Sequence, residues 1–162
     1  TFTETDRIRF LGHEALGADL SVGILERLRL PRAVIDDVAY LVREHMLPRR
    51  APELRRSTLL RLLRHPLLAP LLALHRADAL AGSGDLTGYT FCVAARAEVP
   101  EEKLRPPRLL DGNDLIALGV PRGPRMGALL TALEDAQLEG RVTDRAAAES
   151  FIRAAQAPEP AP

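Results

Sequence analysis

Residues 109–130, LLDGNDLIALGVPRGPRMGALL, contain four glycines and two prolines and indicate the fold most clearly. Asp111, followed three residues later by Asp114, is typical of a helix N-terminus, because such side chains accept hydrogen bonds from the unpaired backbone N–H groups there. Gly119 predicts the end of that helix, since glycine readily adopts the left-handed conformation that closes helices. Pro124 predicts the start of a second helix, because proline fits the first helical position.

The same pattern continues beyond residue 130. Gly140 predicts the end of the helix that starts at Pro124, and Thr143 or Asp144 predicts the cap of a third helix that reaches about residue 155. The apolar residues of the middle helix recur at helical spacing and predict its buried stripe, Met126, Leu129, Leu130 and Leu133.

The N-terminal half also has a helical period. Between residues 13 and 30, apolar side chains recur every four positions and predict one stripe on a helix: Leu16, Leu20, Ile24 and Leu28. Pro31 then predicts a new amphipathic helix with its core face at Val34, Ile35, Val38, Leu41 and Val42. Residues 54–81 are apolar and interrupted by Pro66 and Pro70, which predicts two helices, the second deeply buried.

The segments between these helices predict the domain organisation. Pro48 and Pro52 bracket an expected loop, residues 82–88 form another, and YTFCVAA (residues 89–95) is expected to be a helix or an extended loop. The proline-containing run at residues 98–108 is expected to be a linker. We therefore predict an all-α fold with a helical body at residues 1–98, a smaller helical tail domain at residues 99–157 and a disordered end at residues 158–162.

Composition excludes several classes of protein. The chain has 22 basic and 22 acidic residues and 4% aromatic residues, so it is not a globally basic nucleic-acid binder. The single cysteine, Cys92, excludes an internal disulfide and a cysteine-rich zinc site. No apolar run reaches the roughly 18 residues of a membrane span, and no signal peptide opens the chain. We expect a cytoplasmic protein with no membrane partner.

The neutral total conceals a local excess of positive charge. Residues 43–76 contain eight arginines against two glutamates. A patch of this kind suits a phosphate backbone, and the scarcity of aromatic residues favours recognition of a folded RNA by shape over base stacking. A helix that starts with Gly-Pro between arginines also suits phosphate. The alternative in both places is a solvated basic face. The candidate RNA-binding residues are Arg49, Arg50, Arg55, Arg56, Arg61, Arg64, Arg122, Gly123 and Arg125.

Two segments carry a resemblance to a known family. Residues 111–148, DGNDLIALGVPRGPRMGALLTALEDAQLEGRVTDRAAA, resemble the C-terminal signature of the bacterial tRNA nucleotidyltransferase and poly(A) polymerase family. Residues 7–46, RIRFLGHEALGADLSVGILERLRLPRAVIDDVAYLVREHM, resemble the segment that follows the His-Asp pair in members whose middle region is an HD-type domain.

The resemblance implies a tRNA-binding region of a CCA-, CC- or A-adding enzyme, or of a related poly(A) polymerase. Relatives carry a nucleotidyltransferase head with a Gly-Ser turn and paired carboxylates for magnesium, and no motif here matches it. We therefore expect the head to lie before residue 1 and this chain alone to transfer no nucleotides. The resemblance implies Mg and ATP or CTP as cofactors of the parent, none of them held by this chain. Its implied partners are tRNA and the head.

An HD-type phosphohydrolase remnant is the alternative function. His13, His45 and Asp78 match the later metal-ligand positions of HD domains, but the central His-Asp pair has no counterpart. Three ligands from the later positions of the HD series, without the central pair, make a poor hydrolytic metal site. We therefore expect no metal, and we expect the two histidines to hydrogen-bond within the helical bundle with Asp78 as their partner. A purely structural helical domain is a third possibility.

Overall fold

The computed structural model describes residues 12–156. Within this range the chain forms nine α-helices and one 3₁₀ helix and no β-strand, which confirms the predicted all-α class. The helices are α1 (His13–Arg27), α2 (Arg32–Glu44), the 3₁₀ helix η1 (Leu47–Glu53), α3 (Arg56–Leu63), α4 (Leu68–Ala81), α5 (Thr87–Glu98), α6 (Glu101–Leu104), α7 (Gly112–Ala117), α8 (Pro124–Leu138) and α9 (Arg145–Gln156).

The described residues divide into two compact units. The first unit contains residues 12–53 and 66–94, and the second contains residues 54–65 and 95–156. This division differs from the expected boundary at residues 98 and 99, because α3 packs against α6 and α8 and so belongs with the later helices. Residue 157 and the predicted disordered end at residues 158–162 lie outside the described range.

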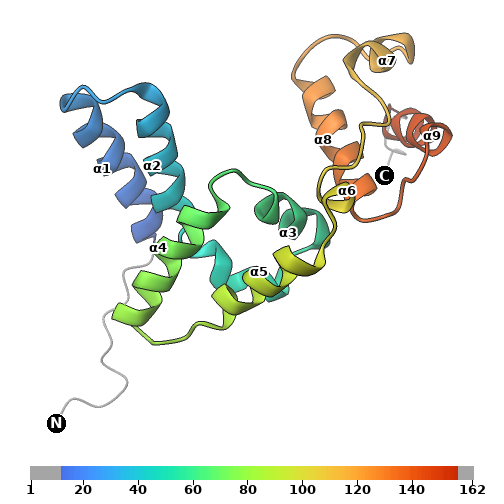
Figure 1. Ribbon diagram of the computed structural model, residues 1–162. Helices are drawn as coiled ribbons and strands as arrows, with labels where there is room; N and C mark the ends of the chain where they lie inside the picture. Colours follow the sequence, from blue (N-terminus) through green and yellow to red (C-terminus); the bar gives the residue numbers. More distant parts are fainter. Residues whose placement is uncertain (1–11, 157–162) are drawn as a thin grey trace, which may run out of the picture. The chain divides into compact units, whose positions relative to one another are not determined.

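In the first unit, α1 and α2 lie side by side as a helical hairpin (Figure 1). Their contact uses small residues of α1: Ala18 is fully buried, and a Cβ atom on Gly17 would lie 3.2 Å from the Cγ1 atom of Val42. The predicted apolar stripe of α1 is on the opposite side. Its side chains are 47–63% exposed, so the helix prediction is correct but the stripe contributes nothing to the core: Leu16, Leu20, Ile24 and Leu28.

Much of the remaining core of the first unit lies on α2 and α4. On α2, Ile35 and Ala39 are buried. The buried face of α4 consists of Leu68, Leu71, Leu72, His75 and Ala79. The expected deep burial of the whole of α4 is wrong, because Leu74 and Leu80 are exposed. Pro70 lies in the first turn of α4, where proline does not interrupt a helix.

The expected loop around Pro48 is a 3₁₀ helix instead, and it packs closely on α5. A Cβ atom on Gly88 would lie 2.2 Å from the carbonyl oxygen of Pro48, so only glycine allows this approach. The segment YTFCVAA lies within α5, which confirms the helical alternative. Cys92 is fully buried there, and burial raises the pKa of its thiol to about 11, so the thiol stays neutral and unreactive.

In the second unit, helix α7 starts and ends as the sequence predicts. The Asp111 carboxylate accepts hydrogen bonds from the backbone N–H groups of Asn113 and Asp114, at 2.8 and 3.0 Å. The Asp114 carboxylate accepts one from the Asp111 N–H at 2.8 Å, which completes a capping box. Gly119 has a φ of +85°, and the next residue, Val120, donates its N–H to the Leu115 carbonyl. This is the glycine-closed C-terminus expected for α7.

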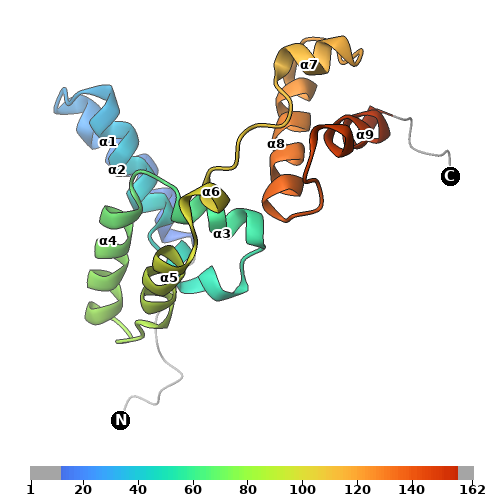
Figure 2. The ribbon, with the colours of Figure 1, turned by 45° about the vertical axis from the view of Figure 1, so that its right-hand side comes forward.

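Helices α7, α8 and α9 gather around one apolar core (Figure 2). Helix α8 starts at Pro124, Gly140 follows its end with a φ of +76°, and the Asp144 carboxylate accepts the Ala147 N–H at the start of α9. These observations confirm the predicted helix ends. The core consists of Leu110, Leu115, Val120, Leu129, Leu133, Ala136, Val142, Ala148 and Ile152, while Met126 and Leu130 are half-buried.

The segment expected to be a linker contains structure of its own. Residues 101–104 form the short helix α6, and Leu104 is fully buried. The linker prediction for residues 98–108 is therefore wrong at its centre. Its prolines limited the prediction, but Pro100 directly precedes the helix, a position that proline favours.

Candidate nucleic-acid interface

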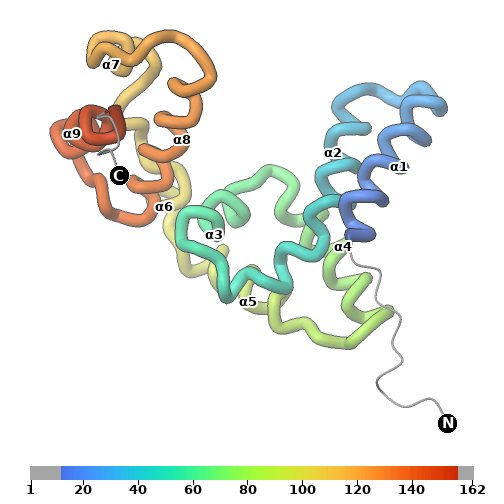
Figure 3. The backbone as a smooth tube through the Cα atoms, turned by 180° about the vertical axis from the view of Figure 1, so that it is seen from behind, coloured from blue at the N-terminus to red at the C-terminus, as the bar shows by residue number. Residues whose placement is uncertain are grey.

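The predicted RNA-binding residues are divided between the two units. Arg49 and Arg50 belong to η1 of the first unit, and the backbone tube in Figure 3 shows η1 directly after α2. The others belong to the second unit: Arg55, Arg56, Arg61, Arg64, Arg122, Gly123 and Arg125.

Arg49 and Arg50 are exposed on η1, and neither makes an ion pair with the residues that the structure describes. Arg49 acts electrostatically on Asp85, which lies two residues before α5. Hydrogen bonds with Thr87 chiefly lower the pKa of Asp85, and the positive charge of Arg49 adds to this effect. The close approach of η1 to Gly88 fixes the backbone that carries the two arginines. The 3₁₀ helix thus presents two adjacent cations on a rigid support.

Arg55 and Arg56 lie at the start of α3 and are also exposed. The Arg56 Nε–H donates to the Leu138 carbonyl at 3.1 Å, and Ser57 donates to the Glu139 carboxylate at 2.9 Å. Arg55 has no carboxylate partner within residues 12–156, although its charge helps to lower the pKa of Glu139. Both arginines keep guanidinium N–H groups in solvent.

Arg61 and Arg64 behave differently, because both bind the same carboxylate on α8. Arg61 Nη2 lies 2.7 Å from Glu134 Oε2, and Arg64 Nη2 lies 2.6 Å from Glu134 Oε1. Arg61 Nη1 also lies 2.7 Å from Asp135 Oδ1. Burial opposes ionisation of Glu134, but hydrogen bonds from Arg64 and Arg61 outweigh it and lower the pKa of that carboxyl. These two arginines therefore hold α3 against α8, a role that sequence reasoning missed.

The start of α8 carries the last predicted group. Arg122 is exposed and makes no ion pair with any described residue, and Arg125 donates to the Ala155 carbonyl at 3.2 Å. Gly123 has a φ of +152°, a conformation that side chains rarely adopt, and it directly precedes Pro124 at the first helical position. In this first turn Pro124 has no N–H group and the Met126 N–H donates to the Gly123 carbonyl at 3.0 Å, so the helix dipole supplies the positive partial charge beside Arg122.

The structure brings together two of the three residues that resemble HD metal ligands. His13 Nε2 lies 3.2 Å from His45 Nε2, and His45 Nδ1 lies 2.7 Å from the Val42 carbonyl. His45 Nδ1 must therefore carry a hydrogen, which leaves its Nε2 as the acceptor when the ring is neutral. Asp78 is exposed on α4, and residues 12–156 contain no group of three or more side chains placed to hold a metal ion.

His75 is a buried residue without a motif in the sequence. Its Nδ1 donates to the carbonyl of His45 at 2.9 Å and ties α4 to the end of α2. Its Nε2 is buried and has no hydrogen-bond partner among residues 12–156. Only its position on the apolar face of α4 distinguishes it in the sequence.

None of the helices from α1 to α9 is long and apolar enough to cross a bilayer. The fold is an all-helical module, and within the predicted set the exposed arginines without an ion pair among residues 12–156 lie on η1, at the start of α3 and at the start of α8. Two tRNA nucleotidyltransferases are similar to this module. The chain is 40% identical over 152 residues to the CC-adding tRNA nucleotidyltransferase of Thermus thermophilus, which covers 92% of the chain and 34% of the enzyme. It is 35% identical over 158 residues to the A-adding tRNA nucleotidyltransferase of Deinococcus radiodurans, which covers 93% of the chain and 36% of the enzyme.

These similarities confirm the resemblance to tRNA nucleotidyltransferases predicted from the sequence. The chain spans about a third of the length of the curated relatives it matches. No model of a known protein family matches the chain. No solved structure is significantly similar to it.

Proposed function

We propose that this chain is a tRNA-binding region of a tRNA nucleotidyltransferase. The observation that carries the proposal is the similarity over more than nine-tenths of the chain to enzymes that add C or A residues to tRNA. The nucleotidyl transfer itself, with magnesium and a nucleoside triphosphate, belongs in this proposal to a head that relatives carry. The setting would be the cytoplasm, where tRNA maturation takes place in bacteria.

The residues proposed to contact RNA are those of the predicted set that have no carboxylate partner among residues 12–156. Arg49 and Arg50 serve the first unit, and Arg55 and Arg122 serve the second, with support from Arg56 and Arg125. An arginine that is exposed and unpaired binds phosphate without first breaking an internal ion pair, so its contact has the lowest cost. Arg61 and Arg64 already form ion pairs with Glu134 and Asp135 and are secondary candidates.

A titration of the chain with a tRNA that lacks its CCA end tests this function. We expect binding that weakens steeply between about 50 and 200 mM salt, because each phosphate contact releases counterions. The double variant Arg49→Ala/Arg50→Ala should bind more weakly. Arg153→Ala is the matched control, because Arg153 is an exposed arginine of α9 that pairs with Glu149. Absence of tRNA binding at low salt would contradict the proposal.

A remnant HD-type metal site is the second candidate, favoured only by the contact between His13 and His45. Two imidazole nitrogens 3.2 Å apart can both reach one metal ion at about 2.0–2.1 Å. Titration with Zn²⁺ or Mn²⁺, with His45→Gln as the comparison, tests it. Metal binding that His45→Gln abolishes would support the phosphohydrolase alternative.

A further inference from the structure

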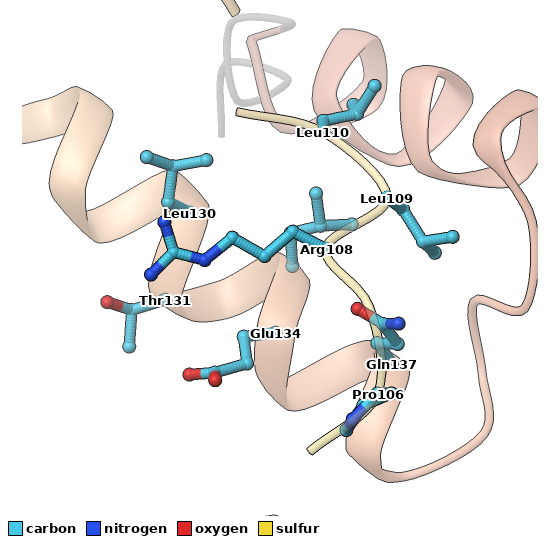
Figure 4. Close-up of a pocket in the computed structure, with 9 residues that line it drawn as sticks. Pro106, Arg108, Leu109, Leu110, Leu130, Thr131, Glu134 and Gln137 are labelled. Atoms are coloured by element: carbon cyan, nitrogen blue, oxygen red, sulfur yellow. The ribbon is translucent and has the colours of Figure 1, made fainter. Parts of the chain in front are cut away.

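The second unit contains a pocket that the proposed arginine contacts leave unused. Its volume is about 150 Å³, and it lies between residues 106–110 and the side of α8 (Figure 4). The apolar lining comes from four leucines, two of them in the core: Leu109, Leu110, Leu130 and Leu133. The polar lining comes from Arg108, Thr131, Glu134 and Gln137.

The polar groups of the pocket differ in how far they are already engaged. Both oxygens of Glu134 accept hydrogen bonds from Arg61 and Arg64, so this carboxylate is neutralised. The amide nitrogen of Gln137 donates to the Pro107 carbonyl at 2.8 Å, which orients the side-chain oxygen as a remaining acceptor.

Arg108 is the available cation of this pocket. It has no hydrogen-bond or ion-pair partner among residues 12–156, and Figure 4 shows its side chain extending from the 106–110 segment toward Leu130. A guanidinium in this position can stack on a planar ring and also donate to an anion beside it. The pocket thus combines an apolar lining, hydrogen-bonding side chains and one guanidinium without an ion-pair partner among residues 12–156.

The volume limits what enters. A cavity of about 150 Å³ is the size that holds one benzene-sized ring, so a single ring fills it and the second ring of a fused system would extend through its open side. The ligand therefore combines a single planar ring, hydrogen-bonding groups at the ring edge and a nearby negative charge. We propose that this pocket binds one pyrimidine nucleotide, with the ring on the leucines, its polar edge toward Gln137 and Thr131, and its phosphate on Arg108.

Two sources supply this chemistry. One is an unpaired nucleotide of a bound RNA, since unstacked bases in loops and ends are the parts of RNA that proteins read individually. The other is a free pyrimidine mononucleotide. The RNA source rests on the proposed function, whereas the pocket itself does not.

Nuclear magnetic resonance with mononucleotides tests the pocket. In the ¹⁵N-labelled chain, cytidine 5′-monophosphate should shift the amide signals of Leu109, Leu130, Thr131 and Gln137 with saturation at millimolar concentration, and adenosine 5′-monophosphate should shift them less. Arg108→Ala should abolish these shifts and leave the amide signals outside the pocket unchanged, because Arg108 makes no hydrogen bond or ion pair with residues 12–156. Shifts that are absent from these amides, or equal for both nucleotides, would overturn the proposal.

The tRNA titration distinguishes the two sources. If RNA supplies the nucleotide, Arg108→Ala should weaken tRNA binding about tenfold, the worth of one charge-assisted contact, while Arg153→Ala should change it by less than about twofold. Equal affinities of the two variants, with cytidine monophosphate still bound, would assign the pocket to the free nucleotide. If the wild-type chain binds no tRNA, the proposed function fails, and the mononucleotide result still decides the pocket.

Discussion

Helices α1 and α8 carry apolar side chains at the same helical spacing, yet they use them in opposite ways. In α8, Leu129 and Leu133 are 8% and 3% exposed and form the core with α7 and α9. In α1, Leu16 and Leu20 are 63% and 57% exposed, and small residues on the other side make the contact with α2. A periodic stripe therefore predicts a helix well, but the partner that covers one face determines which face becomes the core.

The largest expected effect is the loss of a core leucine from α8. Leu133→Ala should lower the free energy of unfolding of the second unit by about 2–5 kcal/mol, because it leaves a cavity. Leu20→Ala in α1 should change the stability of the first unit by less than about 0.5 kcal/mol. Denaturant unfolding followed by amide signals of each unit measures both. Equal losses would contradict the different roles of the two stripes.

The next-largest effect on stability concerns the contact that small residues of α1 make with α2. Ala18→Leu should destabilise the α1–α2 hairpin by about 1–3 kcal/mol, since Ala18 is fully buried and a larger side chain forces the helices apart. Ala15→Leu is the control, because Ala15 is exposed on the same helix. The measurement is the protection of α2 amides from hydrogen exchange. Unchanged protection in Ala18→Leu would show that the hairpin does not depend on this contact.

The two regions also end their helices differently, and the expected effect there is smaller. Arg29 follows α1 with a φ of +57°, whereas Gly119 follows α7 with a φ of +85°. Arg29→Gly should stabilise the first unit by about 0.5–1 kcal/mol, because glycine removes the cost of the left-handed conformation. Gly119→Ala should destabilise the second unit by about 1 kcal/mol for the same reason. Thermal unfolding of the two variants should therefore shift in opposite directions, and shifts of the same sign would be inconsistent with this explanation.

The smallest effect concerns the ion pairs that hold α3 against α8. The pKa of Glu134 in the folded chain lies below its ordinary value of 4.5, so ionised Glu134 stabilises the fold above that pH. Glu134→Gln should cost less than about 1 kcal/mol at pH 7. The difference between wild type and variant should stay constant down to about pH 5 and disappear as the pH falls through the lowered pKa. A difference that grows on acidification would refute this role of the ion pairs.

The sequence predicted the parts of the fold that depend on neighbouring residues. Asp111, Gly119, Pro124 and Gly140 act within one helical turn, and the structure confirms all four. Helix α6 was missed because its four residues are too few to show a helical period between the flanking prolines. Its one core residue, Leu104, is buried by segments that are distant in the sequence. The exposure of the α1 stripe was missed for a related reason, since no local signal shows which face of α1 meets α2.

The candidate interface was predictable as a charge excess but not residue by residue. The run of arginines is visible in the sequence, and Arg49, Arg50 and Arg55 are exposed as expected. The pairing of Arg61 with Glu134 joins residues 73 positions apart. Such a contact depends on how α3 packs, so no signal in the sequence separates a paired arginine from an available one. Arg108 was missed because it stands alone outside the arginine-rich run.

The salt dependence of tRNA binding is the sharpest test of the proposed arginine contacts, because its slope reports how many phosphates the protein neutralises. Replacing Arg49, Arg50, Arg55 and Arg122 by alanine should reduce the slope of log K against log salt by about one for each of these arginines that binds a phosphate. Replacing Arg61 by alanine should leave the slope nearly unchanged while it destabilises the second unit. An unchanged slope in the fourfold variant, or a larger reduction in Arg61→Ala, would contradict the proposal that the exposed, unpaired arginines bind the RNA.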